Sequence, residues 1–412
     1  MLVLSKITSQ KMRAGQWLVT LIAIVFGCLI ATFSAIGYAN AQAFESRAPR
    51  AYLFDVNSRT VLYAQREDER FEPASMAKVL TAAVVFDQLE NGTLRSDSMF
   101  PISEDAWRRG GGPSGRAAMF AELNSAVAVE DLLRGLIIMA GNDAAIALAE
   151  GVARNERAFA TLMSERAEDL GARDSVFTNA TGEPEAGMHT TVRDLVVVAS
   201  ALMNEHPQLY SIFGEPEFTW NDIFQRHRNP IYSEIAGADG LMAGFSDDAG
   251  YGVVGSVERD GRRIVFALSG VDTAEGRVDE ARRLVRYAFE DFRTVRVAEP
   301  GEPIAFARTH GGSVREVGLI AEDGVALELL LPQEGVDRVR ARVAYDSPLA
   351  VPIAAGTQVG RLLVERDGTI IQETPLVAAT DVTEGSLVQR ARDGFLELVI
   401  GWIPPISFAG TF

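Results

Sequence analysis

Apolar residues recur at helical spacing through much of the chain. Residues 73–90 are apolar nearly all round, which is typical of a helix that is buried on every side. Residues 129–152, 158–170, 192–203 and 279–292 also follow helical spacing, and the first of these begins with two acidic residues, as helices often do. The pattern therefore predicts five helices.

Two pairs of strands are predicted around these helices. Residues 51–54 and 60–63 are mostly apolar and flank a turn-rich segment. Residues 251–257 and 263–269 are joined by Asp260-Gly261, which is a strong hairpin signal. Both pairs are expected to be antiparallel.

After residue 295 the helical pattern stops and strict alternation appears. Residues 338–345 place arginines on one face of a predicted strand and mainly apolar side chains on the other. We therefore expect a larger domain over 44–293, followed along the chain by a small all-β domain over 296–382. Two folded domains also fit a chain of 412 residues.

The last 30 residues form a separate predicted element, 383–412. Apolar residues at helical spacing share one face there, opposite a polar face: Leu387, Ala391, Phe395, Leu398, Val399 and Trp402. This pattern favours an amphipathic helix at the inner-membrane surface. The alternative is a helix that docks on the protein itself.

The N-terminal residues 1–43 resemble an export signal. Three basic residues precede an apolar run over 17–38, and Ala39-Asn40-Ala41-Gln42-Ala43 offers small residues for cleavage. An uncleaved membrane anchor is the alternative. The one cysteine, Cys28, lies in this run, so the exported part would carry no disulfide. We expect a periplasmic protein, peripheral on the inner membrane.

Charge and residue spacing exclude several classes of function. A formal net charge of −17 argues against nucleic acid as a partner. The four histidines are scattered without metal-ligand spacing, so no metal is expected. Residues 250–255 match G-x-G-x-x-G, but they lead into a hairpin rather than a helix, so no dinucleotide cofactor is expected.

Lysine occurs only at Lys6, Lys11 and Lys78, whereas every other basic residue apart from histidine is arginine. Lys78 follows Ser75 by three residues at the start of the predicted helix 73–90, so both side chains lie on one face. Burial and the helix N-terminus would lower the pKa of the amine. A neutral amine could then deprotonate Ser75, which arginine could not do.

The segment Pro73-Ala74-Ser75-Met76-Ala77-Lys78 resembles the S-x-x-K motif of serine-type D-alanyl-D-alanine carboxypeptidases, the low-molecular-mass penicillin-binding proteins of peptidase family S11. The resemblance covers about residues 50–290 and includes four further segments in the family's order: Glu104–Trp107, Ile137–Ala144, Thr190–Asp194 and Ala238–Leu241.

The resemblance implies an α/β (α+β) domain of the β-lactamase and transpeptidase type, an antiparallel sheet with helices on its faces. It also implies a C-terminal β-domain and an amphipathic anchor. Family members remove the terminal D-alanine of peptidoglycan pentapeptides through an acyl-enzyme, and β-lactams acylate the same serine. Ser75, Lys78 and Asn142 are the implied catalytic residues.

The chain departs from the family at two motifs. The S-x-N motif falls on Ala140-Gly141-Asn142, so the hydroxyl expected to pass a proton to the leaving amine is missing. The K-T-G motif falls on Met242-Ala243-Gly244, so the residues that normally hold the substrate carboxylate are missing.

The two departures suggest a loss of some 10³–10⁶-fold for the family reaction if nothing compensates. Arg226 and Arg228 lie shortly before Met242 and could supply a cation for the carboxylate, or could simply be surface charge.

Three functions therefore remain open from the sequence. The first is a D-alanyl-D-alanine carboxypeptidase whose activity the two motif departures would weaken. The second is a catalytically impaired homologue that binds peptidoglycan or a cell-wall partner. The third is another serine acyl hydrolase that need not hold a carboxylate.

Overall fold

The computed structural model describes residues 44–322, 326–333 and 335–391. The predicted export signal 1–43 lies outside the described residues, as does most of the predicted tail 383–412. Of that tail, the described residues 387–391 are helical, and Leu387 and Val388 are exposed. Among the described residues, no helix combines the length and apolar character that a membrane span requires.

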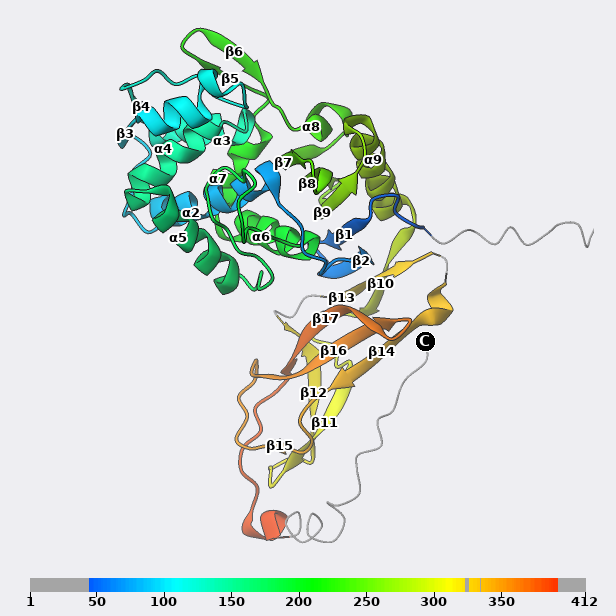
Figure 1. The fold of residues 1–412 in the computed structure, drawn as a ribbon. Helices are drawn as coiled ribbons and strands as arrows, with labels where there is room; N and C mark the ends of the chain where they lie inside the picture. Colours follow the sequence, from blue (N-terminus) through cyan, green and yellow to red (C-terminus); the bar gives the residue numbers. More distant parts are fainter. Residues whose placement is uncertain (1–43, 323–325, 334, 392–412) are drawn as a thin grey trace, which may run out of the picture. The chain divides into compact units, whose positions relative to one another are not determined.

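An antiparallel sheet forms the centre of the larger domain (Figure 1). Its strands follow the order β2 (Thr60–Gln65), β1 (Arg50–Asp55), β9 (Arg262–Val271), β8 (Gly250–Arg259) and β7 (Ala238–Ser246). Both predicted strand pairs are confirmed, and Asp260 and Gly261 make the β8–β9 turn with positive φ.

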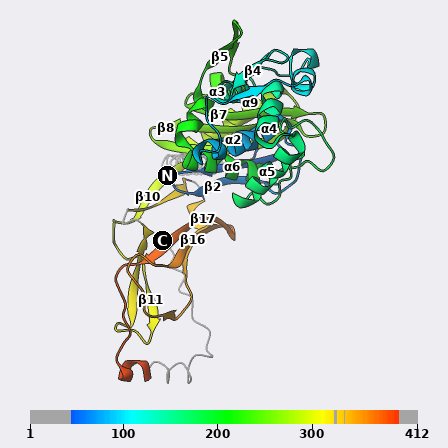
Figure 2. The ribbon, with the colours of Figure 1, turned by 90° about the vertical axis from the view of Figure 1, so that its left-hand side faces the viewer.

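Helices cover the sheet on both faces (Figures 1 and 2). On one side lie α2 (Lys78–Glu90), α3 (Val129–Ile138), α4 (Asn142–Ala153), α5 (Glu156–Asp169) and α6 (Val192–Glu205). On the other side lies α9 (Ala274–Glu290). Helix α6 packs on β1 and β9, whereas α9 packs on β8 and β9. The predicted fold class, a sheet flanked by helices, is confirmed.

Helix α2 is buried as its sequence predicts. Every residue from Lys78 to Phe86 is buried, and the helix lies in the main apolar core of the domain. It is preceded by a single 3₁₀ turn, η1 (Ala74–Ala77), which carries Ser75. Because apolar residues surround α2 on all sides, Lys78 at the first position of the helix lies inside the core.

One predicted helix, 129–152, is wrong as a continuous element. The structure has two helices there, α3 and α4, which are separated at residues 139–141. Ala140 has φ 51°, a left-handed conformation that cannot continue a right-handed helix. The apolar spacing runs on across this corner because both helices bury residues in the same core.

The other predicted helices are confirmed with small shifts of their ends. Helix α9 starts five residues before the predicted position, because Thr273 caps it by accepting a hydrogen bond from Gly276 N at 3.0 Å. Short elements complete the domain: β3 (Met99–Pro101), β4 (Ala126–Ala128), α7 (Pro207–Tyr210), β5 (Glu217–Trp220), β6 (Ile223–Arg226) and α8 (Pro230–Glu234).

The C-terminal domain is all-β in its described residues, as predicted. Antiparallel pairing joins β11 (Ala305–His310), β12 (Glu316–Ala321), β17 (Thr369–Ala378), β16 (Gln358–Arg366) and β14 (Val339–Ala344), and β10 (Phe292–Ala298) pairs with β13 (Leu327–Pro332). On β14 the arginines Arg340 and Arg342 are exposed and their neighbours are half-buried, which matches the predicted alternation.

Candidate active site

Ser75 and Lys78 lie side by side at the start of α2. The Lys78 side chain is completely buried. Its Nζ donates a hydrogen bond to Ser75 Oγ at 3.2 Å and another to Thr181 O at 2.6 Å. The three-residue spacing across η1 and the first turn of α2 therefore brings amine and hydroxyl within reach of a proton transfer.

Burial lowers the pKa of Lys78 to about 7. The carboxylates of Glu183, Asp143 and Glu156 act in the opposite direction, and Arg116 adds to the lowering. Desolvation disfavours the ammonium form more strongly than these carboxylates favour it. Near neutral pH a large fraction of the Lys78 amine is thus unprotonated and can act as a base.

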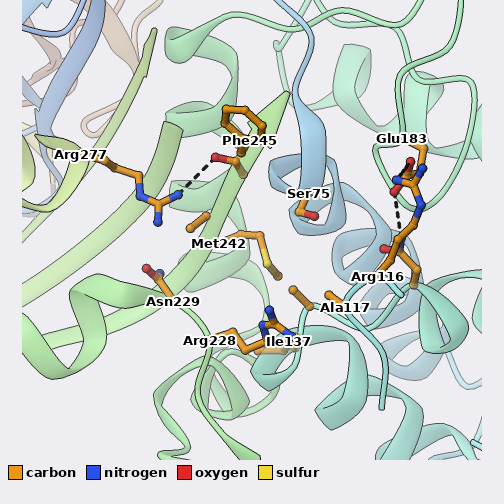
Figure 3. A pocket seen from close by; sticks show the side chains of 14 residues that line it. Ser75, Arg116, Ala117, Ile137, Glu183, Arg228, Asn229, Met242, Phe245 and Arg277 are labelled. Atoms are coloured by element: carbon orange, nitrogen blue, oxygen red, sulfur yellow. Dashed lines mark hydrogen bonds and ion pairs between the residues drawn. The ribbon is translucent and has the colours of Figure 1, made fainter. Parts of the chain in front are cut away.

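A pocket of about 450 Å³ opens beside Ser75. Figure 3 shows Ser75 between Arg277 and Phe245 on one side and Arg116 and Glu183 on the other. The remaining lining residues come from segments far apart in the chain: Ala117, Ile137, Ala140, Asn142, Arg228, Asn229, Met242, Ala243 and Gly244. The pocket lining thus includes a residue or more from each of the three motifs of the sequence analysis: Ser75, Ala140, Asn142, Met242, Ala243 and Gly244.

Asn142 stands at the first position of α4 and is almost fully buried. Its Nδ2 donates to Glu183 Oε1 at 3.0 Å, whereas its Oδ1 has no hydrogen-bond partner among the described residues. The neighbouring Asp143 accepts hydrogen bonds from Met119 N at 2.9 Å and Ala121 N at 3.1 Å. Asp143 thereby ties the start of α4 to the preceding loop and fixes the position of Asn142.

The loop 179–183 supplies the acceptor for Lys78. The buried Asn179 organises it: its Oδ1 accepts from Thr181 Oγ1 at 3.0 Å and from Gly182 N at 2.8 Å, and its Nδ2 donates to Glu183 O at 2.9 Å. Gly182 has φ +79°, and a Cβ there would lie 1.8 Å from Ala74 O. Only glycine allows the loop to approach η1 so closely.

Strand β7 carries the degraded motif Met242-Ala243-Gly244 along the pocket. The Met242 side chain is 2% exposed, so a buried thioether stands at the position where the resemblance implies a lysine. A Cβ on Gly244 would lie 3.1 Å from Pro73 O and 3.2 Å from Ser75 N. Glycine is therefore favoured at position 244 on steric grounds, because the strand passes close against the turn that carries Ser75.

The two arginines that the sequence analysis considered are placed differently. Arg228 lines the pocket, whereas Arg226 is an exposed residue of β6 and is not part of the lining. Arg277, near the start of α9, also lines the pocket. Its Nη1 donates to Gly244 O at 3.2 Å, a contact drawn in Figure 3, and its buried Nε has no partner.

Arg277 and its neighbour Asn229 present unpaired donors. No carboxylate among the described residues pairs with Arg277, and burial lowers the pKa of its guanidinium. The Asn229 side chain is 4% exposed, and its Nδ2 has no partner within the described part of the chain. Its Oδ1 is held by Ile231 N at 3.3 Å at the start of α8. The guanidinium of Arg277, with its unpartnered Nε, and the unpartnered Nδ2 of Asn229 are suited to an anionic ligand.

Sequence reasoning missed five residues of this site: Arg116, Asn179, Glu183, Asn229 and Arg277. The turn-rich run Asn179-Ala180-Thr181-Gly182 could have signalled a tight loop. Nothing in the sequence indicated that this loop lies against Ser75, or that α9 directs an arginine into the pocket. The contact between Lys78 and Thr181 joins positions 103 residues apart, and that between Arg277 and Gly244 joins positions 33 residues apart.

A group outside the pocket has metal-ligand geometry. The ligand atoms of Asp87, Glu205 and His206 lie within 4.8 Å of one another. Arg166 Nε already pairs with Asp87 at 2.8 Å, and its Nη2 also pairs with Glu205. A guanidinium therefore supplies the positive charge there, and we assign no metal to this group.

Comparison with known proteins agrees with this architecture. The family model of D-alanyl-D-alanine carboxypeptidases, peptidase family S11, matches residues 38–273, and the model of the penicillin-binding protein 5 C-terminal domain matches residues 292–384. The chain is 32% identical over 358 residues to the D-alanyl-D-alanine carboxypeptidase DacD of Escherichia coli, covering 86% of this chain and 92% of that protein.

Two solved structures are similar as well. Penicillin-binding protein 5 from Haemophilus influenzae matches with a TM-score of 0.71 and 31% identity, over 83% of this chain and 99% of that one. Penicillin-binding protein D2 from Listeria monocytogenes, in a cefotaxime-bound form, matches with a TM-score of 0.54 and 28% identity, over 60% of this chain and 99% of that one.

We predict that Gly182→Ala disrupts the site. The added Cβ would collide with Ala74 O, so the loop must move away from Lys78, and the free energy of unfolding should fall by more than about 2 kcal/mol. Gly187→Ala is the matched control, because Gly187 has φ +92° but no atom within 4 Å of its Cβ position. It should cost only about 1–2 kcal/mol. Urea unfolding of both variants makes the comparison, and equal losses would contradict the steric argument.

Proposed function

Because the chain belongs to the D-alanyl-D-alanine carboxypeptidase family, we propose that it removes the terminal D-alanine from peptidoglycan pentapeptides through an acyl-enzyme on Ser75. The observation that carries the proposal is the contact between Lys78 Nζ and Ser75 Oγ, at 3.2 Å in a buried setting that lowers the pKa of the amine to about 7.

Acylation then follows from the chemistry of these two groups. The neutral Lys78 amine takes the proton of Ser75 as Oγ bonds to the carbonyl carbon of the penultimate D-alanine. Backbone N–H groups of the turn η1, such as that of Ser75, would stabilise the oxyanion. When the C–N bond breaks, the proton held by Lys78 passes to the leaving amine, and free D-alanine departs.

In deacylation Lys78 again acts as the base, this time toward a water molecule. Lys78, neutral again, takes a proton from a water molecule as the water oxygen bonds to the acyl carbon. The bond to Ser75 Oγ breaks, and Oγ recovers its proton from the Lys78 ammonium. A single amine can serve both steps because its pKa lies near the working pH.

We assign the substrate carboxylate to Arg277 and Arg228, assisted by Asn229 Nδ2. These groups line the same pocket as Ser75, and Arg277 and Asn229 carry buried donors without partners among the described residues. They would supply the positive charge that Met242 and Ala243 cannot. A lost charge-assisted contact to the carboxylate costs about ten- to a hundredfold, and these groups would offset part of that loss.

No hydroxyl side chain other than that of Ser75 is among the described residues that line the pocket, so the missing hydroxyl at Ala140 has no replacement there. Proton transfer to the leaving amine falls to Lys78 directly, so we expect a slower enzyme than a family member with an intact S-x-N motif. An impaired homologue that only binds peptidoglycan would have no need of a buried lysine with a lowered pKa next to Ser75. A different serine acyl hydrolase would have no need of the donors around Arg277.

The domain arrangement and location belong to the same proposal. We infer an export signal over 1–43, a catalytic domain over 44–293, a β-domain over 296–382 and a membrane-association tail over 383–412, with the protein in the periplasm. The exposed Leu387 and Val388 at the start of the tail support its contact with the inner membrane. β-Lactams should acylate Ser75, since the Listeria protein named above was solved with cefotaxime bound.

We predict that a penicillin forms a covalent adduct with Ser75 at a rate that rises with pH. The reactive form is the neutral Lys78 amine, so the rate should fall about tenfold per pH unit below pH 7 and level off above it. Intact mass of the full chain measures the adduct at each pH. Ser75→Ala should give no adduct. The assignment of Ser75 as nucleophile and Lys78 as base would be refuted if the unaltered protein formed no adduct, or if the rate did not depend on pH.

We predict that Arg277→Gln removes the preference for a free C-terminal carboxylate. A peptide ending in D-alanyl-D-alanine and its C-terminal amide are compared by kcat/KM. The unaltered protein should prefer the acid by about ten- to a hundredfold, and the variant should lose most of that preference. Arg226→Gln is the control, because Arg226 is exposed on β6 and should leave the preference unchanged. A variant that keeps the full preference would contradict the assignment.

A further inference from the structure

Glu183 is the carboxylate that lines the pocket, and its backbone is held rigidly. Asn179 Nδ2 donates to Glu183 O at 2.9 Å, and Glu183 N donates to Thr181 Oγ1 at 3.2 Å. The preceding residue, Gly182, is in contact with the turn that carries Ser75. The loop thus fixes Glu183 relative to the nucleophile without help from the side chain itself.

The Glu183 side chain joins two functional groups. Its Oε1 accepts from Asn142 Nδ2 at 3.0 Å, and its Oε2 pairs with Arg116, a contact visible in Figure 3. Arg116 is about half exposed, whereas Glu183 is mostly buried. The guanidinium therefore covers the carboxylate from the solvent side and keeps it in place.

This contact determines which way the Asn142 amide points. A carboxylate only accepts hydrogen bonds, so it must face the Nδ2 of Asn142 and not the Oδ1. The Oδ1 is left buried and without a partner among the described residues. An acceptor oriented in this way beside Ser75 is available for an N–H of a bound peptide.

Glu183 also affects the charge near the base. Four groups act on Lys78 from the elements around it: Glu183 and Arg116 from loops, Asp143 from α4 and Glu156 from α5. Among these charges the Glu183 carboxylate has the largest effect and favours the ammonium, which Arg116 opposes. The ion pair Glu183–Arg116 thus places two opposing charges near one amine.

We propose that Glu183, held by Arg116, is a positioning residue of this active site, which orients the Asn142 amide and balances the charge around Lys78. The inference rests on the proposed function, since it assigns Glu183 to the same reaction. It gives the chain, which lacks a hydroxyl at Ala140, a polar anchor for the remaining asparagine of that motif. Glu183 itself need not touch the reacting atoms.

Three variants test the proposal in the full chain. Glu183→Gln keeps an acceptor for Asn142 but removes the charge, Glu183→Ala removes both, and Arg116→Gln removes the opposing charge. Glu168→Gln on α5 is the control, because that carboxylate is exposed and lies outside the pocket lining. Lys78 is the one lysine beyond residue 11, so isotope-labelled lysine gives an NMR signal whose titration can be followed without any turnover.

We expect Lys78 to titrate at lower pH in Glu183→Gln, at higher pH in Arg116→Gln, and at an unchanged pH in Glu168→Gln. The rate of Ser75 acylation at high pH should fall about ten- to a hundredfold in Glu183→Ala and much less in Glu183→Gln, because an unpaired buried amide remains only in the former. Identical titration of Lys78 in all variants, or equal acylation rates in Glu183→Ala and Glu183→Gln, would overturn the proposal. An unaltered protein that penicillin does not acylate would instead refute the proposed function, while the titration still decides the role of Glu183.

Discussion

The burial of one amine is the constraint on which the active site depends. Lys78 is among the largest side chains that are fully removed from solvent, and an ammonium there would lose its hydration without a direct carboxylate partner among the described residues. The fold therefore favours a neutral amine, and the pKa of Lys78 falls to about 7. A group that is unfavourable for the core in its charged form becomes useful as a base next to Ser75.

Several local features serve to hold that amine in place. The 3₁₀ turn η1 directs Ser75 toward it, the loop organised by Asn179 presents Thr181 O to it, and β7 closes the pocket where Gly244 passes against the turn. Glycine is required at Gly182 and favoured at Gly244 because backbones come within contact distance there. Of the positions matched to the family motifs by resemblance, Gly244 lies against the serine-bearing turn, whereas Ala140, Met242 and Ala243 carry no polar side chain.

Much of the fold could be predicted from local sequence, since apolar spacing and turn residues report on each element by itself. The buried helix α2, the β8–β9 hairpin and the alternation on β14 were all anticipated for this reason. The break at Ala140 was not, because apolar spacing continues through the corner. Arg277 and Glu183 were missed since they reach the pocket through packing between distant segments. The sequence left Arg226 and Arg228 open as a cation for the carboxylate or as surface charge, and of the two only Arg228 lines the pocket.

The central claim is that the Ser75–Lys78 pair still turns over a D-alanyl-D-alanine substrate despite the altered motifs. The most direct measurement is the release of free D-alanine from a synthetic pentapeptide by the full chain, with Ser75→Ala in parallel. We expect slow but continuing release, with one D-alanine for each shortened peptide and none in the variant. Release no greater than that of Ser75→Ala would contradict it.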